Sequence, residues 1–218
     1  MNGMSLRFRW TRLLAVVVLA GVVAAGVPAV RTSWLRAAGQ ALVVDEPVEP
    51  SDVIVLPKWA GAAGAIEAAD LVHDGIAGLV AVLPEPQKPA ERELARRGVP
   101  DASETIELVR LLHALDVANV ELIPDPAAGT EAEGQVLLAW CGRRQFRSIL
   151  VVSSADHSRR VRRVLHRSLW GQATKVTIRS ARYSTFAPDS WWTTRDGART
   201  GIVELQKLLL DLLRHPIS

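Results

Sequence analysis

The sequence predicts an α/β domain built on a Rossmann-like, mostly parallel sheet with helices on both faces, preceded by one N-terminal transmembrane helix. The first observation behind this prediction is that short β-branched runs alternate along the chain with longer segments of helical periodicity. The runs are apolar at nearly every position, which is typical of strands that are buried on both faces of a parallel sheet. The second observation is a long stretch without charge near the N-terminus, which predicts the membrane helix.

Five strands are expected, and each ends where small or polar residues begin. The predicted strands cover residues 52–56, 79–83, 120–123, 148–153 and 175–178. Helical spacing and end signals predict helices over residues 61–73, from a capping box at Asp101 and Glu104, over residues 130–141 and from about Asp156. Between the second strand and the second helix, three prolines predict a loop: Pro84, Pro86 and Pro89. A last helix carries four apolar residues on one face: Ile202, Leu205, Leu209 and Leu212.

The stretch without charge covers residues 13–30, which is 18 residues. As a helix it is roughly 27 Å long at about 1.5 Å per residue, enough to cross the core of a bilayer. Three arginines precede it, while Arg31 and Arg36 follow it before the acids at positions 45, 46 and 49, so the positive-inside rule places the N-terminus in the cytoplasm. We therefore expect a single-pass protein of the bacterial inner membrane whose domain lies outside the cytoplasm. Its predicted parts are a cytoplasmic N-terminus (1–12), a transmembrane helix (13–30), a linker (31–50) and an α/β domain (51–214). A signal peptide cleaved near residues 27–29 is the alternative.

The formal net charge of +3 hides an uneven distribution of charged residues along the chain. The five basic residues of the first forty positions flank the predicted anchor, which leaves 21 basic and 23 acidic residues in the remainder. This balance excludes a nucleic-acid binder that works by bulk charge. The single cysteine, Cys141, excludes an intrachain disulfide and a cysteine-cluster metal site, and its apolar neighbours predict a buried thiol.

Small polar residues follow the fourth predicted strand and lead into a helix over residues 153–160. In a parallel sheet such a junction binds anions, because free backbone N–H groups and the helix dipole favour negative charge there. The surrounding stretch from Arg143 to Arg182 contains eleven arginines and lysines against one acid, Asp156. The motif therefore predicts a phosphate-like or other anionic ligand.

Within this motif the candidate functional residues are Ser153, Ser154, His157 and Arg160. His157 and Arg160 are three positions apart and share one helix face, where the imidazole can transfer a proton and the guanidinium can hold an anion. A solvated first-turn histidine is the alternative for His157. The two serines either donate hydroxyls to a phosphate or cap the turn. A Ser–His–Asp triad within the motif is disfavoured, because adjacent positions face different directions.

A second candidate set lies at the start of the helix over residues 130–141. Thr130 and Glu133 have the spacing of a capping box, in which they satisfy each other's backbone. In the functional alternative, Thr130 and the preceding Gly129 bind the ligand, while a carboxylate of Glu131 or Glu133 holds a metal or supplies a second acid or base at the same sheet edge. After the first strand, Gly61 begins a fragment of a phosphate-loop pattern, for which flexible linking or close helix packing is the alternative. No residues are assigned as metal ligands.

In their order along the chain these motifs resemble the YdcF-like family, which includes the SanA and ElyC envelope proteins. The resemblance covers roughly residues 42–213 and is carried by the anchor and by residues 52–56, 68–75, 129–133, 153–160, 191–192 and 204–207. It implies a Rossmann-like domain with a role in cell-envelope integrity or peptidoglycan-precursor metabolism. One branch of the family is associated with binding S-adenosylmethionine.

The chain departs from the family pattern at two places. The family has a glycine pair after its first strand and then an arginine, whereas this chain has Pro57 and Lys58 followed by Ala62 and Ala63. Lys58 offers a substitute positive charge, as a flexible point charge and not as a fork. Gly129 stands where the family commonly has asparagine.

From these observations we expect the domain to bind a phosphorylated envelope intermediate, lipid-linked or free. If it is an enzyme, phosphoryl hydrolysis or transfer suits the basic loop, with His157 as the proton-transfer group, Arg160 as the anion clamp and Glu131 or Glu133 as a second acid or base. One alternative is a non-catalytic envelope factor with a degenerate pocket that acts through protein partners. Another is a nucleoside-cofactor (S-adenosylmethionine) binding protein. The sequence names no cofactor.

Overall fold

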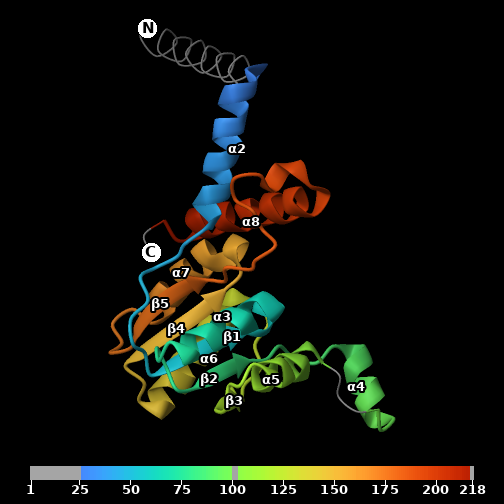
Figure 1. Cartoon of the computed structure of the whole chain (residues 1–218), viewed down its shortest axis with the longest axis vertical. Helices are drawn as coiled ribbons and strands as arrows, with labels where there is room; N and C mark the ends of the chain where they lie inside the picture. The colour runs from blue at the N-terminus through green and yellow to red at the C-terminus, as the bar shows by residue number, and fades with distance from the viewer. Residues whose placement is uncertain (1–25, 100–102, 217–218) are drawn as a thin grey trace, which may run out of the picture.

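The computed structural model describes residues 26–99 and 103–216. At its centre lies a five-stranded, all-parallel sheet in the order β3-β2-β1-β4-β5, which confirms the predicted α/β class and all five strands (Figure 1). The strands are β1 (Val53–Pro57), β2 (Val80–Leu83), β3 (Val120–Leu122), β4 (Ser148–Ser153) and β5 (Lys175–Ser180). Every residue of β1 and β2 is buried, as expected for apolar runs at the centre of a parallel sheet.

Helices cover both faces of the sheet, as predicted. The helices α3 (Gly61–His73) and α5 (Glu104–Ala114) pack together on one face, and α6 (Thr130–Arg144) and α7 (Ser158–Ser168) pack together on the other. Alternate residues of β1 serve the two cores, because successive side chains of a strand point to opposite faces. Ile54 and Leu56 belong to the core under α3, whereas Val53 and Val55 belong to the core under α6 and α7.

The order of the strands places a topological switch point between β1 and β4. The chain builds the sheet outward from β1 to β3, then crosses back through α6 to add β4 and β5 on the other side. The segments that leave the carboxyl ends of β1 and β4 therefore diverge. The divergence opens the place where open α/β sheets bind their ligands.

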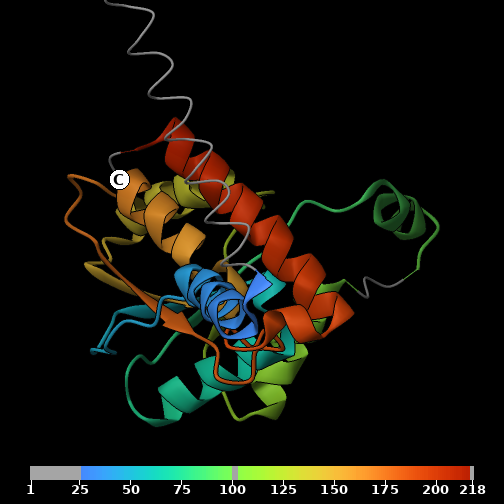
Figure 2. The same ribbon diagram turned by 90° about the horizontal axis from the view of Figure 1, so that it is seen from above.

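A third layer lies beyond α7. It consists of α2 (Pro28–Leu42), the short η3 (Trp191–Thr193) and α8 (Arg195–Arg214), and it is seen at the upper end in Figure 1 and from above in Figure 2. Trp191 joins the layer together, because its indole N–H donates to Leu35 O over 2.7 Å. The close approach requires a glycine on α2: a Cβ added at Gly39 would lie 2.1 Å from the carbonyl oxygen of Pro188.

The expected linker over residues 31–50 is helical up to Leu42 and then runs along the domain. The Glu46 N–H donates to Ile178 O over 2.9 Å, and the Val44 N–H donates to Ser158 Oγ over 2.7 Å. Most of the predicted transmembrane helix, residues 13–25, lies outside the described residues. Among residues 26–99 and 103–216, none of the helices combines the length and apolar character that crossing a bilayer requires.

Two local predictions differ from the structure. The proline-rich stretch expected as a loop contains the helix α4 (Pro89–Arg96), since proline is compatible with the first turn of a helix and Pro89 occupies that position. The helix expected from Asp101 begins at Glu104 with Ser103 as its N-cap residue, and Asp101 itself lies outside the described residues. Around the sheet edge, two short 3₁₀ turns precede helices: η1 (Lys58–Ala60) and η2 (Ala155–His157).

Candidate functional site

In the loop after β4, several polar groups that the sequence predicted to be free for a ligand are hydrogen-bonded within the protein. The Ser153 side chain is buried, and its hydroxyl donates to Ser154 O over 2.9 Å. The N–H of Ala155 donates to Ser184 Oγ over 3.2 Å, and the N–H of His157 donates to Ser154 O. These backbone groups, which we expected to be free for an anion, are used within the protein.

His157 and Arg160 lie together at the start of α7, on one face as their spacing predicts. Their side chains are 16% and 14% exposed. The Arg160 guanidinium contacts His157 Nε2 and donates to Thr130 Oγ1 and, over 3.1 Å, to Glu204 Oε2. The same carboxylate of Glu204 lies 3.1 Å from His157 Nδ1. The motif after β4 and the start of α6 therefore meet, and a residue of α8 joins them.

Trp59 connects Glu133 to His157. The Trp59 indole N–H donates to Glu133 Oε1 over 2.9 Å, and the Trp59 ring packs on the His157 ring with centroids 4.7 Å apart. Burial raises the pKa of Glu133 above its usual value, and the bond from Trp59 and the positive charges of His157 and Arg160 offset this only in part. Glu133 is therefore the carboxyl group in this cluster that is best suited to hold a proton.

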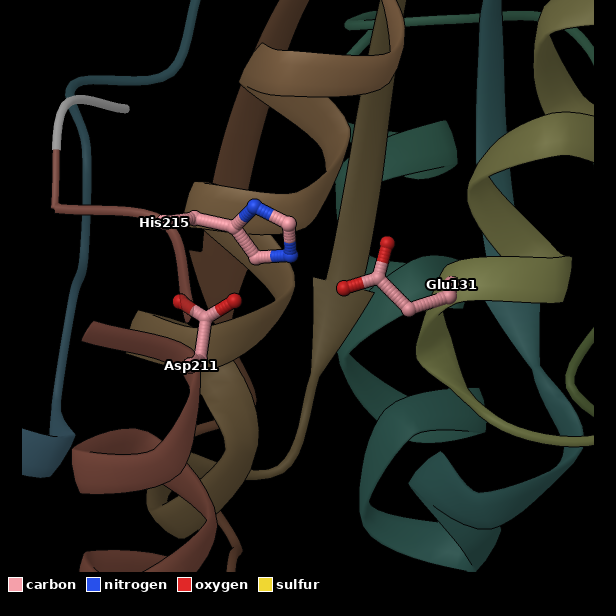
Figure 3. Close-up of side chains that lie close together, drawn as sticks. All are labelled: Glu131, Asp211 and His215. Carbon is pink, nitrogen blue, oxygen red and sulfur yellow. The ribbon is translucent and has the colours of Figure 1, made fainter. Parts of the chain in front are cut away.

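Glu131 does not belong to this cluster. Its exposed carboxylate accepts from Arg167 and faces Asp211 of α8 and His215 just beyond it (Figure 3). The ligand atoms of Glu131, Asp211 and His215 lie within 4.8 Å of one another, close enough to surround a metal ion. Asp211, however, already pairs with Arg163 over 2.6 Å and with Arg167 over 3.2 Å. We therefore assign these carboxylates to an ion-pair network that attaches α8 to α7.

A second group with metal-ligand chemistry consists of Asp156, His157 and Glu204. Glu204 is shared between Arg160 and Lys207, whose ammonium donates to its second oxygen over 2.7 Å. Two cations thus already neutralise the carboxylate that a metal ion would need. Burial alone would raise the pKa of Asp156, but the hydrogen bond and charge of His157 outweigh it and hold the pKa below its usual value.

After the end of β1, Lys58 begins η1, and Gly61 directly follows this turn. The Lys58 ammonium pairs with Glu85 over 2.8 Å and with Glu104 over 3.4 Å. Burial lowers the pKa of Lys58, but these two carboxylates outweigh it and raise the pKa above its usual value. Lys58 lines a cavity of about 610 Å³ at the carboxyl ends of β1, β2 and β3. Gly61 adopts φ +59° as η1 passes into α3, which is a backbone conformation that favours glycine.

A second cavity, of about 450 Å³, lies at the N-terminus of α6. Gly129 precedes this helix with φ +86°, and no side chain among the described residues caps it. The first N–H groups of a helix have no partner within the helix, and the residues that carry them at the start of α6 are among those that line the cavity. The cavity is lined by Gly129, Thr130 and Glu131 of the α6 start, by Arg160, and by Lys207, Asp211, Arg214 and His215.

Most of the positive charge counted between Arg143 and Arg182 is compensated by acids from distant parts of the chain. Arg162 pairs with Glu46, and Arg179 pairs with Glu67. Nothing in the sequence indicated these partners, and Trp59 and Glu204 were not among the predicted site residues. The resemblance to the YdcF-like family included residues 204–207, and this was the available signal for Glu204.

The fold and this edge define the class of protein: a Rossmann-like α/β domain whose polar cluster lies at the switch point between β1 and β4. No family model and no curated protein matches this chain.

Proposed function

We propose that this chain is a membrane-anchored, extracytoplasmic domain that binds the phosphate group of an envelope intermediate, in line with its resemblance to the YdcF-like family. The observation that carries the proposal is the cavity of about 450 Å³ in which Arg160 borders the uncapped start of α6. Backbone N–H groups and the dipole of a helix of this length favour an anion at its N-terminus. Arg160 adds a guanidinium fork, which matches the oxygens of a phosphate.

The charges that line the cavity also favour an anion. Arg160 and Lys207 share the single carboxylate of Glu204, Glu131 and Asp211 are paired with arginines of α7, and Arg214 adds a further positive charge. Thr130 lies between the helix start and Arg160, and its hydroxyl already accepts from the guanidinium. A phosphate in the cavity would meet the backbone donors of α6 and the side chains of Arg160 and Thr130 together.

If the bound group reacts, phosphoryl hydrolysis or transfer is the chemistry that these residues suit. Glu204 lies 3.1 Å from His157 Nδ1 and orients the ring, so that Nε2 is the nitrogen left to exchange a proton with a ligand. In the structure Nε2 faces Arg160. A phosphate that takes over the donors of Arg160 frees Nε2 for proton transfer. Glu133, with its raised pKa, is the second acid or base.

A non-catalytic ligand-binding factor that acts through protein partners is the second candidate. It is favoured by the placement of His157, which is largely buried and is not among the residues that line the cavity. Lys58 also departs from the family pattern, and its charge is held by Glu85 and Glu104. Turnover of a bound phosphate ester separates the two candidates.

Titration of the full-length protein in detergent with phosphate, pyrophosphate, an isoprenoid phosphate and S-adenosylmethionine tests the proposal. Arg160→Lys keeps the positive charge beside Glu204 but removes the fork. Loss of a charge-assisted bond of roughly 1.5–3 kcal/mol lowers phosphate affinity at least about tenfold. Arg143→Lys is the matched control, because Arg143 is exposed and pairs with Asp125 outside the cavity. If both variants weaken phosphate binding equally, or if neither variant weakens it, the result contradicts the proposed site.

The location of the domain has its own test. A reporter fused to the C-terminus, active only outside the cytoplasm, is expected to be active because three arginines precede the predicted anchor and two follow it. If this reporter is inactive and a second reporter, which works only in the cytoplasm, is active on the same fusion, the extracytoplasmic part of the proposal is contradicted. That result favours the nucleoside-cofactor alternative.

A further inference from the structure

The last helix, α8, is attached to the domain by ion pairs and by a small apolar cluster with α2 and η3. Its buried residues are Gly201, Glu204, Leu208 and Asp211, and both acids form ion pairs with arginines of α7. Of the apolar face that the sequence predicted on this helix, Leu205 packs partly against this cluster, and the other three residues are exposed. Exposed on α8 are Ile202, Val203, Leu209, Leu210, Leu212 and Leu213.

This arrangement is unusual for the surface of a soluble domain. Single exposed leucines need no explanation, but a helix that buries charges and exposes six large apolar residues on one side has a missing partner for that side. Leu213, for example, is 71% exposed. The exposed apolar residues form two groups on this side, residues 202–203 and residues 209, 210, 212 and 213, with Gln206 between them, and such an apolar side is the pattern of a helix lying in a membrane interface.

The position of α8 next to α2 identifies the partner. α2 begins at Pro28, within the apolar stretch of residues 13–30, and it packs on α8. Figure 2, which looks down on the upper end of Figure 1, shows both helices on the side that faces the viewer. Gly39, where α2 meets the loop before α8, is nine residues beyond Val30, which is about 14 Å of helix. The apolar face is therefore held within reach of the surface that the anchor enters.

Charge points to the same partner. The exposed charged residues of α8 are basic at four positions, Arg195, Arg199, Lys207 and Arg214, and acidic at one, Asp196. Leucines flanked by basic side chains suit the acyl chains and the anionic headgroups of a bilayer surface. A second copy of the chain with the same charges would be repelled.

We infer that α8 lies on the bilayer surface through its exposed apolar face and docks the domain against the membrane beside its anchor. The inference rests on the anchor that forms part of the proposed function. It also places the cavity at the α6 start, which shares Lys207, Leu210 and Arg214 with α8, at the membrane surface.

The test uses the full-length protein in vesicles of phosphatidylglycerol and phosphatidylethanolamine, with an environment-sensitive fluorophore on a single introduced cysteine. Leu209→Cys and Leu213→Cys report on the apolar face of α8. Leu94→Cys is the matched control, because it is 48% exposed on α4, far from α2 and α8 (Figure 1). Cys141 is buried with a pKa raised to about 11, and the labelled wild type measures its background.

We expect the emission from positions 209 and 213 to shift to the blue and to be quenched by doxyl-labelled lipids, with little change at position 94. Flotation of the wild type with the vesicles after alkaline washing tests the anchor separately. A chain that floats but shows no quenching at positions 209 and 213 overturns the inference alone. A chain that does not float overturns the anchor as well. A blue shift without lipid quenching, together with cross-linking between Leu213→Cys copies, assigns the face to a second copy and also overturns the inference.

Discussion

Two glutamates are buried on opposite faces of the sheet, and they differ in how their charge is compensated. Glu67 of α3 is 1% exposed, and Glu133 of α6 is 5% exposed. Glu67 accepts from Arg179 Nε over 2.8 Å and from the Nε and backbone N–H of Arg182. Glu133 accepts from the neutral indole of Trp59.

The pKa of each carboxyl group follows from these partners. Burial alone would raise the pKa of Glu67, but the bonds and charges of Arg179 and Arg182 outweigh it and hold the pKa below its usual value. Burial also raises the pKa of Glu133, and there it prevails. A buried carboxylate whose negative charge is fully compensated by cations stabilises the fold. A buried carboxylate whose charge is only partly compensated lowers stability, and such groups are typical of functional sites.

The largest expected effect is the loss of stability when Glu67 loses its charge. Glu67→Gln weakens charge-assisted hydrogen bonds, so we expect the free energy of unfolding to fall by about 1.5–3 kcal/mol near neutral pH. Because the folded-state pKa of Glu67 is lowered, its contribution is fully present above the unfolded-state pKa and is lost as the pH falls through the folded-state pKa. Urea denaturation of wild type and variant from neutral to acidic pH measures both the loss and its decline.

A control for this measurement is Asp125→Asn. Asp125 forms an exposed pair with Arg143, and such pairs contribute about 0–1 kcal/mol. If Glu67→Gln costs no more than this control, the compensation of Glu67 is not stabilising and the contrast with Glu133 fails.

A smaller loss is expected when Glu133 loses its donor. Trp59→Phe keeps an aromatic ring against His157 but removes the indole N–H, at a cost of about 0.5–1.5 kcal/mol in unfolding free energy. The pKa of Glu133 should rise further, so the cost is greater at neutral pH than in acid, where the carboxyl group is protonated. Trp192→Phe is the control, because the Trp192 indole N–H has no acceptor among the described residues. A cost that does not change with pH argues against a charged Glu133 in the native state.

The difference between the two glutamates also shows what could be predicted from the sequence. The fold could be predicted, because apolar runs of strand length and periodic helices are local patterns. The strands β1 to β5 all lie where these patterns occur. The shared face of His157 and Arg160 is likewise a local property of helix spacing. The short α4 was missed because its prolines were interpreted as breaks, although Pro89 occupies the first turn.

The partners of charged residues could not be predicted, because they come from distant positions. Glu67 and Arg179 are 112 positions apart, and Arg160 and Glu204 are 44 apart. An excess of arginine in one segment therefore says little about the field at its surface until the acids that fold onto it are known. For the same reason the sequence indicated that Glu131 and Glu133 are equivalent candidates, whereas the structure places Glu133 in the buried cluster and Glu131 among the exposed ion pairs.

The smallest expected effect has the opposite sign. Glu133→Gln removes a buried charge but keeps the shape of the side chain and an acceptor for Trp59, so we expect a gain in unfolding free energy of under about 1 kcal/mol at neutral pH. Because the folded-state pKa of Glu133 is raised, its contribution to stability is present below the unfolded-state pKa and is lost as the pH rises through the folded-state pKa. The advantage of the variant should therefore appear as the pH rises and vanish in acid. Urea midpoints of wild type, Glu133→Gln and Glu67→Gln over the same pH range measure it. If both glutamine variants lose stability in parallel, Glu133 is a structural carboxylate like Glu67, and the case for it as an acid or base in the proposed site is lost.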